Sequence, residues 1–162
     1  MNKNINSIAL MLLLGLFAAS CTGIYENGEE LAGSLKGRVD EVTADELRTR
    51  IDNGDDFLLL DVRQQSEYDN GSIPGAVNIP RGELEFKIRD DGFWEEEYLY
   101  TPENDAEIII FCKLGYRGAL SAHALKQLGF TKVKNLKGGM LSWDPEMDKN
   151  APVKSSGGGC GG

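Results

Sequence analysis

Cys112 occupies a position at which a protein can make a thiol reactive. It follows the apolar run at residues 107–111, which predicts a buried strand, and precedes a short loop and a helix expected over residues 117–128. Backbone N–H groups of the loop and the positive end of the helix dipole favour a thiolate, and Lys113 and Arg117 add positive charge. An isolated cysteine after an apolar strand is usually an inert thiol, but the glycine and arginine of this loop favour a nucleophile. Such a thiolate could attack a soft sulfur atom and hold it as a persulfide.

The overall composition argues against metal sites, disulfide frameworks and nucleic-acid partners. The chain has 162 residues, three cysteines and one histidine, and it has no CxxC motif. This set predicts neither a disulfide framework nor a structural zinc site, so we expect no metal and no cofactor. The formal net charge of −9 argues against nucleic acid as a partner, because phosphate binding depends on Lys and Arg.

Helix signals and apolar runs alternate along the chain, which predicts a parallel α/β sheet. Thr43 and Glu46 form a capping box at the start of a short helix that ends near Gly54. Strands are expected at residues 57–60, 76–79, 107–111 and 132–136. Asp61 and Cys112 both follow strand ends, so we expect both to face one crevice at the carboxyl edge of the sheet.

Several stretches of the sequence, in the same order, resemble the motifs of the rhodanese family. They are Asp61-Val62-Arg63, Glu67-Tyr68, GSIPGAVNIP at residues 71–80, the loop at residues 112–117, and LGF, LKGGM and Trp143 between residues 128 and 143. The match runs from about residue 39 to residue 143. Ser72 departs from the family, which usually has His at a position that looks structural. The resemblance implies a rhodanese-like parallel β-sheet flanked by helices on both faces.

The resemblance also implies a sulfurtransferase of the thiosulfate sulfurtransferase type. Cys112 would take sulfane sulfur from a small anionic donor such as thiosulfate and pass it to a thiol or another thiophilic acceptor, including an acceptor protein. The residues that would bind the donor form the loop Lys113, Leu114, Gly115, Tyr116 and Arg117. Asp61, Arg63 and Glu67 would orient and stabilise the site, with a salt bridge expected between Arg63 and Glu67.

Two other functions fit parts of the same pattern. A sulfur-binding or sensing module would load Cys112 without turnover. A phosphatase or arsenate reductase of the same fold would carry a loop one residue longer than the six positions from Cys112 to Arg117. The loop length therefore favours sulfur transfer over phosphate or arsenate chemistry.

The N-terminal residues predict export. The apolar run at residues 8–19 is shorter than the roughly 20 residues that span a bilayer, and it fits a signal peptide over residues 1–20. Ala18-Ala19-Ser20-Cys21 resembles a bacterial lipobox, although Ala18 stands where Leu is usual. We expect a lipid on Cys21 that anchors the protein to a bacterial membrane of the cell envelope, facing the periplasm. An ordinary secretory signal is the alternative. A flexible spacer is expected at residues 21–37, before a domain at residues 38–146.

Two further segments have open interpretations. Residues 81–106 are acidic and aromatic, and they could pack beside the crevice or cover a sheet edge. Residues 147–162 predict a flexible Gly-rich tail that carries Cys160. Its ending resembles the cysteine-bearing arm of the sulfur-carrier subunit of bacterial thiosulfate-oxidising complexes, which implies a relay of sulfur from Cys112 to Cys160. An incidental thiol is the alternative.

Overall fold

The computed structural model describes residues 23–146. The predicted signal peptide at residues 1–20, the predicted lipid site Cys21 and the predicted tail with Cys160 lie outside these residues. None of the helices within residues 23–146 is long and apolar enough to traverse a lipid bilayer.

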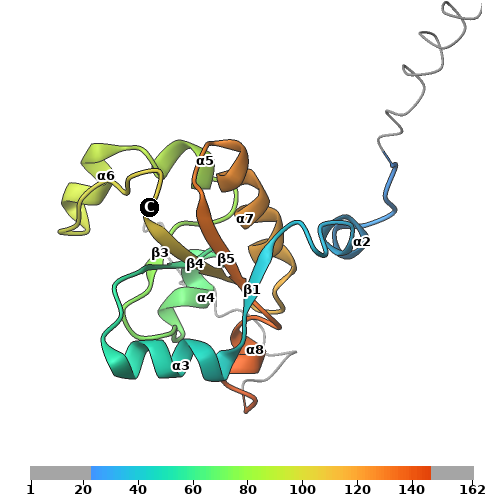
Figure 1. Ribbon diagram of the computed structural model, residues 1–162, viewed down its shortest axis with the longest axis horizontal. Coiled ribbons are helices and arrows are strands. Elements are labelled where there is room, and N and C mark those ends of the chain that lie inside the picture. The colour runs from blue at the N-terminus through green and yellow to red at the C-terminus, as the bar shows by residue number, and fades with distance from the viewer. Residues whose placement is uncertain (1–22, 147–162) are drawn as a thin grey trace, which may run out of the picture.

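Within these residues, five parallel strands form one sheet with the order β1-β5-β4-β2-β3 (Figure 1). The strands are β1 (Asp40–Val42), β2 (Leu58–Asp61), β3 (Val77–Asn78), β4 (Glu107–Phe111) and β5 (Lys132–Leu136). The central strand β4 and its neighbours β2 and β5 were predicted from their sequences. β1 was not predicted, because its three residues contain only one apolar side chain. The predicted parallel sheet is confirmed.

Helices cover both faces of the sheet, as the sequence predicts. They are α2 (Gly28–Gly33), α3 (Ala44–Asn53), α4 (Gln65–Asp69), α5 (Leu84–Lys87), α6 (Asp91–Glu96), α7 (Tyr116–Gln127) and α8 (Met140–Trp143). Figure 1 shows α3 below the sheet and α5 and α7 above it. Successive residues of β4 serve opposite faces, because side chains alternate along a strand. Ile108 and Ile110 pack with the α7 side, and Ile109 and Phe111 pack with the α3 side.

The start and end of α3 follow its sequence signals. Thr43 Oγ1 accepts a hydrogen bond from the backbone N–H of Glu46, and the Glu46 carboxylate accepts one from the backbone N–H of Thr43. Gly54 ends the helix with φ of 70°, a left-handed conformation that glycine adopts without steric cost. The predicted capping box and helix end are therefore confirmed.

The segment expected to be a flexible spacer contains a short packed helix. Asn27 caps the start of α2, and α2 packs against α7. Ala32 and Leu35 are only 6% exposed, and Leu35 belongs to the same core as α7. The prediction of a spacer is therefore wrong for residues 28–37, because these two apolar side chains supply enough burial to dock a polar, glycine-flanked segment.

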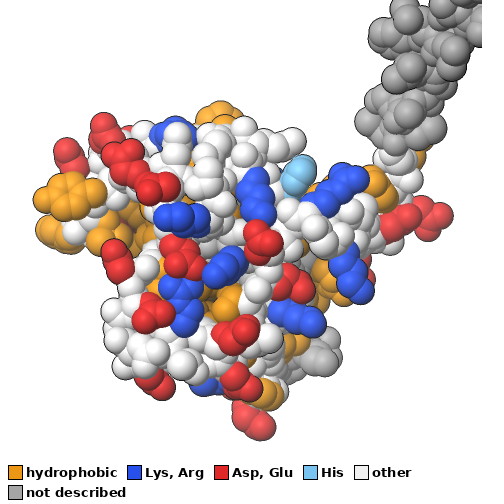
Figure 2. Space-filling view, viewed as in Figure 1, with side chains coloured by type: hydrophobic (Ala, Val, Ile, Leu, Met, Phe, Trp, Pro, Cys, Tyr) orange, Lys and Arg blue, Asp and Glu red, His pale blue; other side chains and the backbone are white. Residues whose placement is uncertain are grey.

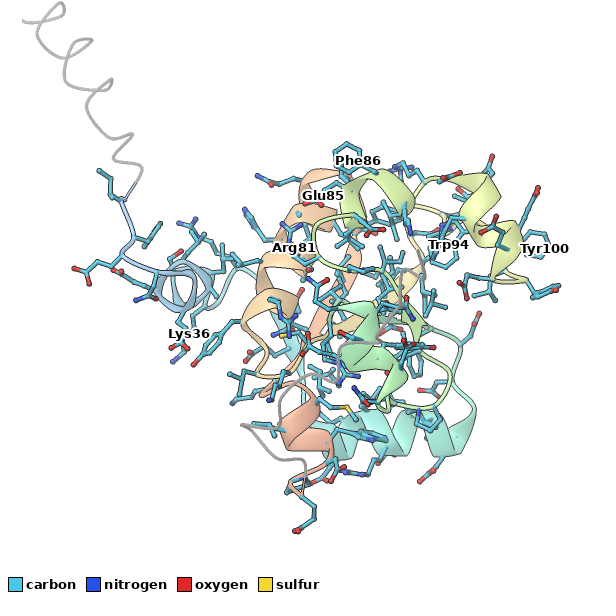
Figure 3. All side chains as sticks on the ribbon, turned by 180° about the vertical axis from the view of Figure 1, so that it is seen from behind. Lys36, Arg81, Glu85, Phe86, Trp94 and Tyr100 are labelled. Carbon is cyan, nitrogen blue, oxygen red and sulfur yellow. The ribbon has the colours of Figure 1, made fainter. Side chains whose placement is uncertain are left out.

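Residues 81–106 form a cover over one face of the sheet. The core on the α7 side almost fully buries three of their side chains: Leu84 in α5, Ile88 directly after α5, and Trp94 in α6. The chain then enters the start of β4, and Tyr100 lies at the opposite end of the molecule from Lys36 (Figure 3). Figure 2 shows acidic side chains around hydrophobic ones at this α6 end. The contacts place the segment on a face of the sheet, whereas one of the two interpretations had it cover a sheet edge.

Candidate active site

Cys112 lies directly after β4, at the carboxyl edge of the sheet. Its side chain is buried, with 1% of the residue exposed, and its Sγ accepts a hydrogen bond from the backbone N–H of Gly115 at 3.2 Å. The chain turns there and begins α7 at Tyr116. The strand, the loop and the helix therefore hold the sulfur at the place and in the type of turn that the sequence predicts.

The loop presents its side chains in different directions. Leu114 and Tyr116 are 44% and 41% exposed, so they border the site from the outside. Lys113 is half-buried, and Gly115 contributes its backbone N–H to the sulfur. Arg117 stands in the first turn of α7. All five residues predicted to bind the donor are thus close in space, and Gly115 contacts the sulfur through its backbone N–H.

Arg117 is held by Glu67 of α4. The guanidinium donates two hydrogen bonds to the carboxylate, at 2.8 and 2.9 Å, in the bidentate geometry that makes arginine–carboxylate pairs strong. The Glu67 hydrogen bonds raise the pKa of Arg117 above its ordinary value, and the nearby Cys112 acts in the same direction. Burial works to raise the pKa of Glu67, but hydrogen bonds from Arg117 and from the Gln64 backbone outweigh it and lower that pKa. Arg117 therefore carries a fixed positive charge next to the sulfur.

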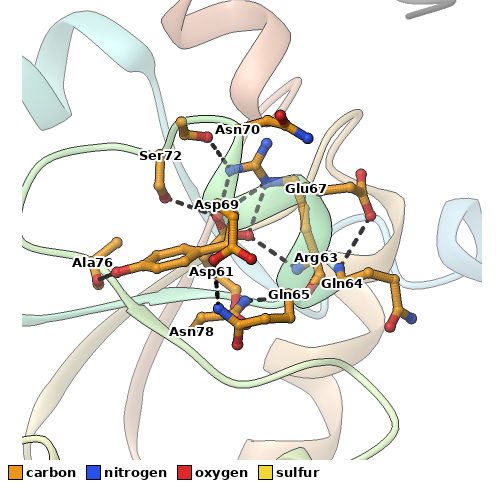
Figure 4. Close-up of polar contacts among 12 residues, drawn as sticks. Asp61, Arg63, Gln64, Gln65, Glu67, Asp69, Asn70, Ser72, Ala76 and Asn78 are labelled. Carbon is orange, nitrogen blue, oxygen red and sulfur yellow. Dashed lines mark hydrogen bonds and ion pairs between the residues drawn. The ribbon is translucent and has the colours of Figure 1, made fainter. Parts of the chain in front are cut away.

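Asp61 and Arg63 form a buried ion pair beside the same loop. Their residues are 0% and 2% exposed, and the Arg63 guanidinium donates to the Asp61 carboxylate at 2.6–3.0 Å (Figure 4). Arg63 also donates to the carbonyl oxygen of Gly71, and Ser72 Oγ donates to Asp61 at 2.8 Å. Buried charges need such partners, because an unpaired one costs several kcal/mol (about 3–5). The pair therefore fixes the end of β2 against the segment before β3.

These contacts correct one sequence prediction. The expected salt bridge between Arg63 and Glu67 is wrong, because Arg63 pairs with Asp61 and Glu67 pairs with Arg117. Arg63 lies before α4 begins, so it does not share a helix face with Glu67. Its side chain instead turns back to the carboxylate at the strand end. The prediction that all three residues support the site is consistent with this arrangement, but through different partners.

The loop is also supported from the segment after β5. The backbone N–H of Met140 donates to the Cys112 carbonyl at 2.7 Å, and that of Leu141 donates to the Lys113 carbonyl at 3.1 Å. Gly139 has φ of 62° and ψ of −151°, a region open essentially to glycine alone. A Cβ atom there would overlap the Cys112 carbonyl oxygen and lie 2.7 Å from the Gly115 nitrogen. Only glycine therefore allows this close approach of two backbones.

The comparison with known families agrees with this geometry. The family model described as "Rhodanese-like domain" matches residues 43–146, which is more than half of the chain. The chain belongs to the rhodanese-like family. The human thiosulfate:glutathione sulfurtransferase is 34% identical over 106 residues, covering 63% of this chain and 90% of the relative. The solved human single-domain sulfurtransferase TSTD1 is 31% identical, with a TM-score of 0.61, over 68% of this chain and 99% of that chain.

Some relatives are much longer than the matched region. A Meyerozyma guilliermondii protein named adenylyltransferase and sulfurtransferase UBA4 is 34% identical over 97 residues, covering 60% of this chain but only 22% of that protein. The chain spans 57% of a Bacillus subtilis relative that is 33% identical over 116 residues. Several relatives of this rhodanese-like chain are named sulfurtransferases.

Sequence reasoning missed two contributions to the rhodanese-like site. Ser72 was noted as a departure from the family, but its hydrogen bond to Asp61 was not predicted. Gly139 was noted as part of a motif, without its contact to the active loop. A signal for the second existed, because β5 neighbours β4 and the segments that follow adjacent parallel strands meet at one edge.

Proposed function

We propose that this protein is a sulfurtransferase that moves sulfane sulfur from a donor such as thiosulfate to a thiophilic acceptor through a persulfide on Cys112. The observation that carries the proposal is the position of Cys112 Sγ, which is buried at a strand end and accepts a hydrogen bond from the Gly115 N–H. The fixed charge of Arg117 and the start of α7 lie beside it. The sulfurtransferase names of several relatives support the same reading.

The transfer has two displacement steps. In the first, the Cys112 thiolate attacks the outer sulfur of thiosulfate, a new S–S bond forms, and sulfite leaves with the electron pair of the broken S–S bond. In the second, an acceptor nucleophile attacks the outer sulfur of the persulfide, and the electron pair returns to Cys112 as a thiolate. The backbone N–H of Gly115 and the positive charge of Arg117 stabilise the negative charge on the sulfur in both steps. No external oxidant or reductant is needed.

The test of this function uses Cys112→Ser. The purified wild-type protein should convert thiosulfate and cyanide to thiocyanate and sulfite, and intact mass should show one added sulfur atom after treatment with thiosulfate alone. The variant should fold normally and show neither result. A persulfide without turnover on cyanide would support the sensing module instead, and hydrolysis of p-nitrophenyl phosphate that depends on Cys112 would support a phosphatase. Full activity of Cys112→Ser would refute a role for this sulfur.

The acceptor of the sulfur, either a small thiol or Cys160 of the same chain, is a further part of the proposal. The human relative is named a thiosulfate:glutathione sulfurtransferase, which makes a small thiol the first acceptor to test. The relay from Cys112 to Cys160 is tested by peptide mass spectrometry after loading with thiosulfate. Label on Cys160 that disappears in Cys112→Ser would support the relay, whereas absence of label on Cys160 would refute it.

Export and lipid anchoring are proposed from the N-terminal sequence. If Cys21 carries the lipid, Cys21→Ala should move the protein from the membrane fraction to the soluble fraction of the envelope. Stable anchoring takes more than one lipid chain, so the wild-type protein should stay with membranes after a salt wash. Retention of the alanine variant on membranes after the same wash would show that another feature anchors it.

A further inference from the structure

A pocket of about 300 Å³ lies between the N-terminal segment and the active loop. One wall comes from α2 and the turn after it, including Gly33, Leu35 and Lys36. The opposite wall comes from Leu114, Gly115 and Tyr116 of the active loop, and the strands behind contribute Glu41, Asn135 and Lys137. Its volume is at the lower end of the range for small-molecule sites. The pocket exists because α2 is docked on α7, in place of the flexible spacer that the sequence predicts.

The charges around this pocket are not compensated within the described part of the chain. Lys36, Glu41 and Lys137 are exposed at its rim, and no ion pair among residues 23–146 includes any of them. The charged residues of the neighbouring strands behave differently, since Glu107 pairs with both Arg50 and Lys134. Two cations and one anion around an apolar wall fit a ligand with carboxylates, an ammonium group and a short carbon chain.

The pocket adjoins the reacting sulfur through one residue. Gly115 lines the pocket and also donates its N–H to Cys112 Sγ. Leu114 and Tyr116 flank that residue, and both are more than 40% exposed. A molecule held in the pocket is therefore placed at the border of the active loop, next to the residue whose N–H contacts the reacting sulfur.

We propose that this pocket binds the sulfur acceptor, and that the acceptor is a zwitterionic low-molecular-weight thiol of the cysteine-peptide class. Its carboxylates lie at Lys36 and Lys137, its ammonium lies at Glu41, and its backbone lies along Leu35. The inference rests on the proposed function of Cys112. In the transfer, the acceptor thiolate attacks the outer sulfur of the persulfide and forms R–S–S⁻. The bond to Sγ breaks and its electron pair restores the Cys112 thiolate, so the step needs no co-reactant.

Two sets of variants of the full-length protein test the pocket. The double change Lys36→Gln with Lys137→Gln removes the two cations, and Gly33→Leu fills the pocket from the α2 side. A Cβ atom at Gly33 would meet no heavy atom within 4 Å, so this change should not disturb the fold. The matched controls are Lys132→Gln, an exposed lysine outside the pocket, and Gly28→Leu, an α2 glycine with equally open surroundings.

The assay compares three acceptors at saturating thiosulfate: glutathione, the uncharged thiol 2-mercaptoethanol, and cyanide. We expect the KM for glutathione to rise by up to about 25-fold in the double lysine variant, because two exposed ion pairs contribute up to about fivefold each. Gly33→Leu should raise it about tenfold or more, because it removes contact surface for the whole ligand. The rates with cyanide and 2-mercaptoethanol, and all rates of the controls, should stay within about twofold.

The outcomes separate this inference from the proposed function. If the wild-type protein transfers sulfur to no acceptor, the function is wrong, and binding of the unreactive S-methylglutathione, followed by NMR, then decides the pocket alone. If cyanide and glutathione rates both survive in every variant, the pocket is not the acceptor site. If the variants slow only the labelling of Cys160 and leave the glutathione KM unchanged, the occupant is the chain itself and the small-thiol proposal is overturned.

Discussion

Replacing Gly139 by alanine tests whether two backbones must touch to build the active loop. Gly139 combines a conformation that is open essentially to glycine with a close approach to the loop. The added Cβ would overlap the Cys112 carbonyl oxygen and lie 2.7 Å from the Gly115 nitrogen and 2.9 Å from the Lys113 carbonyl carbon. All three are backbone atoms, so none can move away by a simple side-chain rotation.

The size of the effect follows from two separate costs. The backbone conformation costs about 1–3 kcal/mol for a residue other than glycine. Forcing a methyl group into a packed position costs about 1–3 kcal/mol more. Gly54→Ala is the matched control, since Gly54 also has positive φ but a Cβ there would meet no heavy atom within 4 Å. We expect about 1–2 kcal/mol of destabilisation for the control and about 4 kcal/mol for Gly139→Ala.

The two variants are compared by urea unfolding and by thiocyanate formation. Gly54→Ala should keep the wild-type kcat. Its strain is confined to the turn at the end of α3, because the added Cβ meets no heavy atom within 4 Å. Gly139→Ala should lower kcat strongly even under conditions where it remains folded, since the Gly115 N–H is displaced from the sulfur. The reasoning is refuted if the two variants have free energies of unfolding within about 0.5 kcal/mol of each other and the same kcat.

Three further predictions follow from individual contacts. Glu67→Gln removes the carboxylate partner of Arg117 and should cost about 1–2 kcal/mol of stability and lower kcat/KM for thiosulfate, whereas equal kinetics would contradict a positioning role. Because the pKa of Glu67 is lowered, its stabilisation is present above the unfolded pKa near 4.5 and should fade below it, so wild type and variant should converge in acid unfolding. Hydrogen bonds from Arg50 lower the pKa of Glu107 to about 2. Because solvent screens this partly exposed pair, Glu107→Gln should lower the free energy of unfolding by only about 1 kcal/mol at neutral pH. The difference in free energy of unfolding between wild type and variant should disappear as the pH falls from 4.5 to about 2.

The sequence was sufficient for the elements that carry strong local signals. In the run EIIIF at residues 107–111 the last four residues are apolar and the three isoleucines are β-branched, so β4 is predicted from these residue types alone. The end of α3 follows from the left-handed preference of glycine at Gly54. Cys112 comes between such a strand and a helix, and its place at the sheet edge therefore follows from chain order. These features depend only on neighbours within a few residues.

The features that were not predicted depend on contacts between distant segments. Glu67 and Arg117 are 50 residues apart, and nothing in the local pattern indicates that α4 faces the start of α7. The nearer partner Arg63 looked suitable, but it lies before the helix and is used by Asp61. The docking of α2 depends on Ala32 and Leu35 within a polar stretch, which is too weak a pattern to predict burial.

Several elements of the described residues 23–146 support the active loop in addition to the start of α7. The segment after β5 donates hydrogen bonds to two carbonyl oxygens of the loop, and Glu67 of α4, the helix after β2, accepts hydrogen bonds from Arg117. The sulfur accepts a hydrogen bond from the backbone of the loop itself. Because β4 lies between β2 and β5, these supports come together only when the three central strands have paired. The native geometry of the loop therefore depends on the assembled sheet. Partially unfolded forms that lose either neighbouring strand should lose the arrangement around Cys112 while keeping the thiol itself.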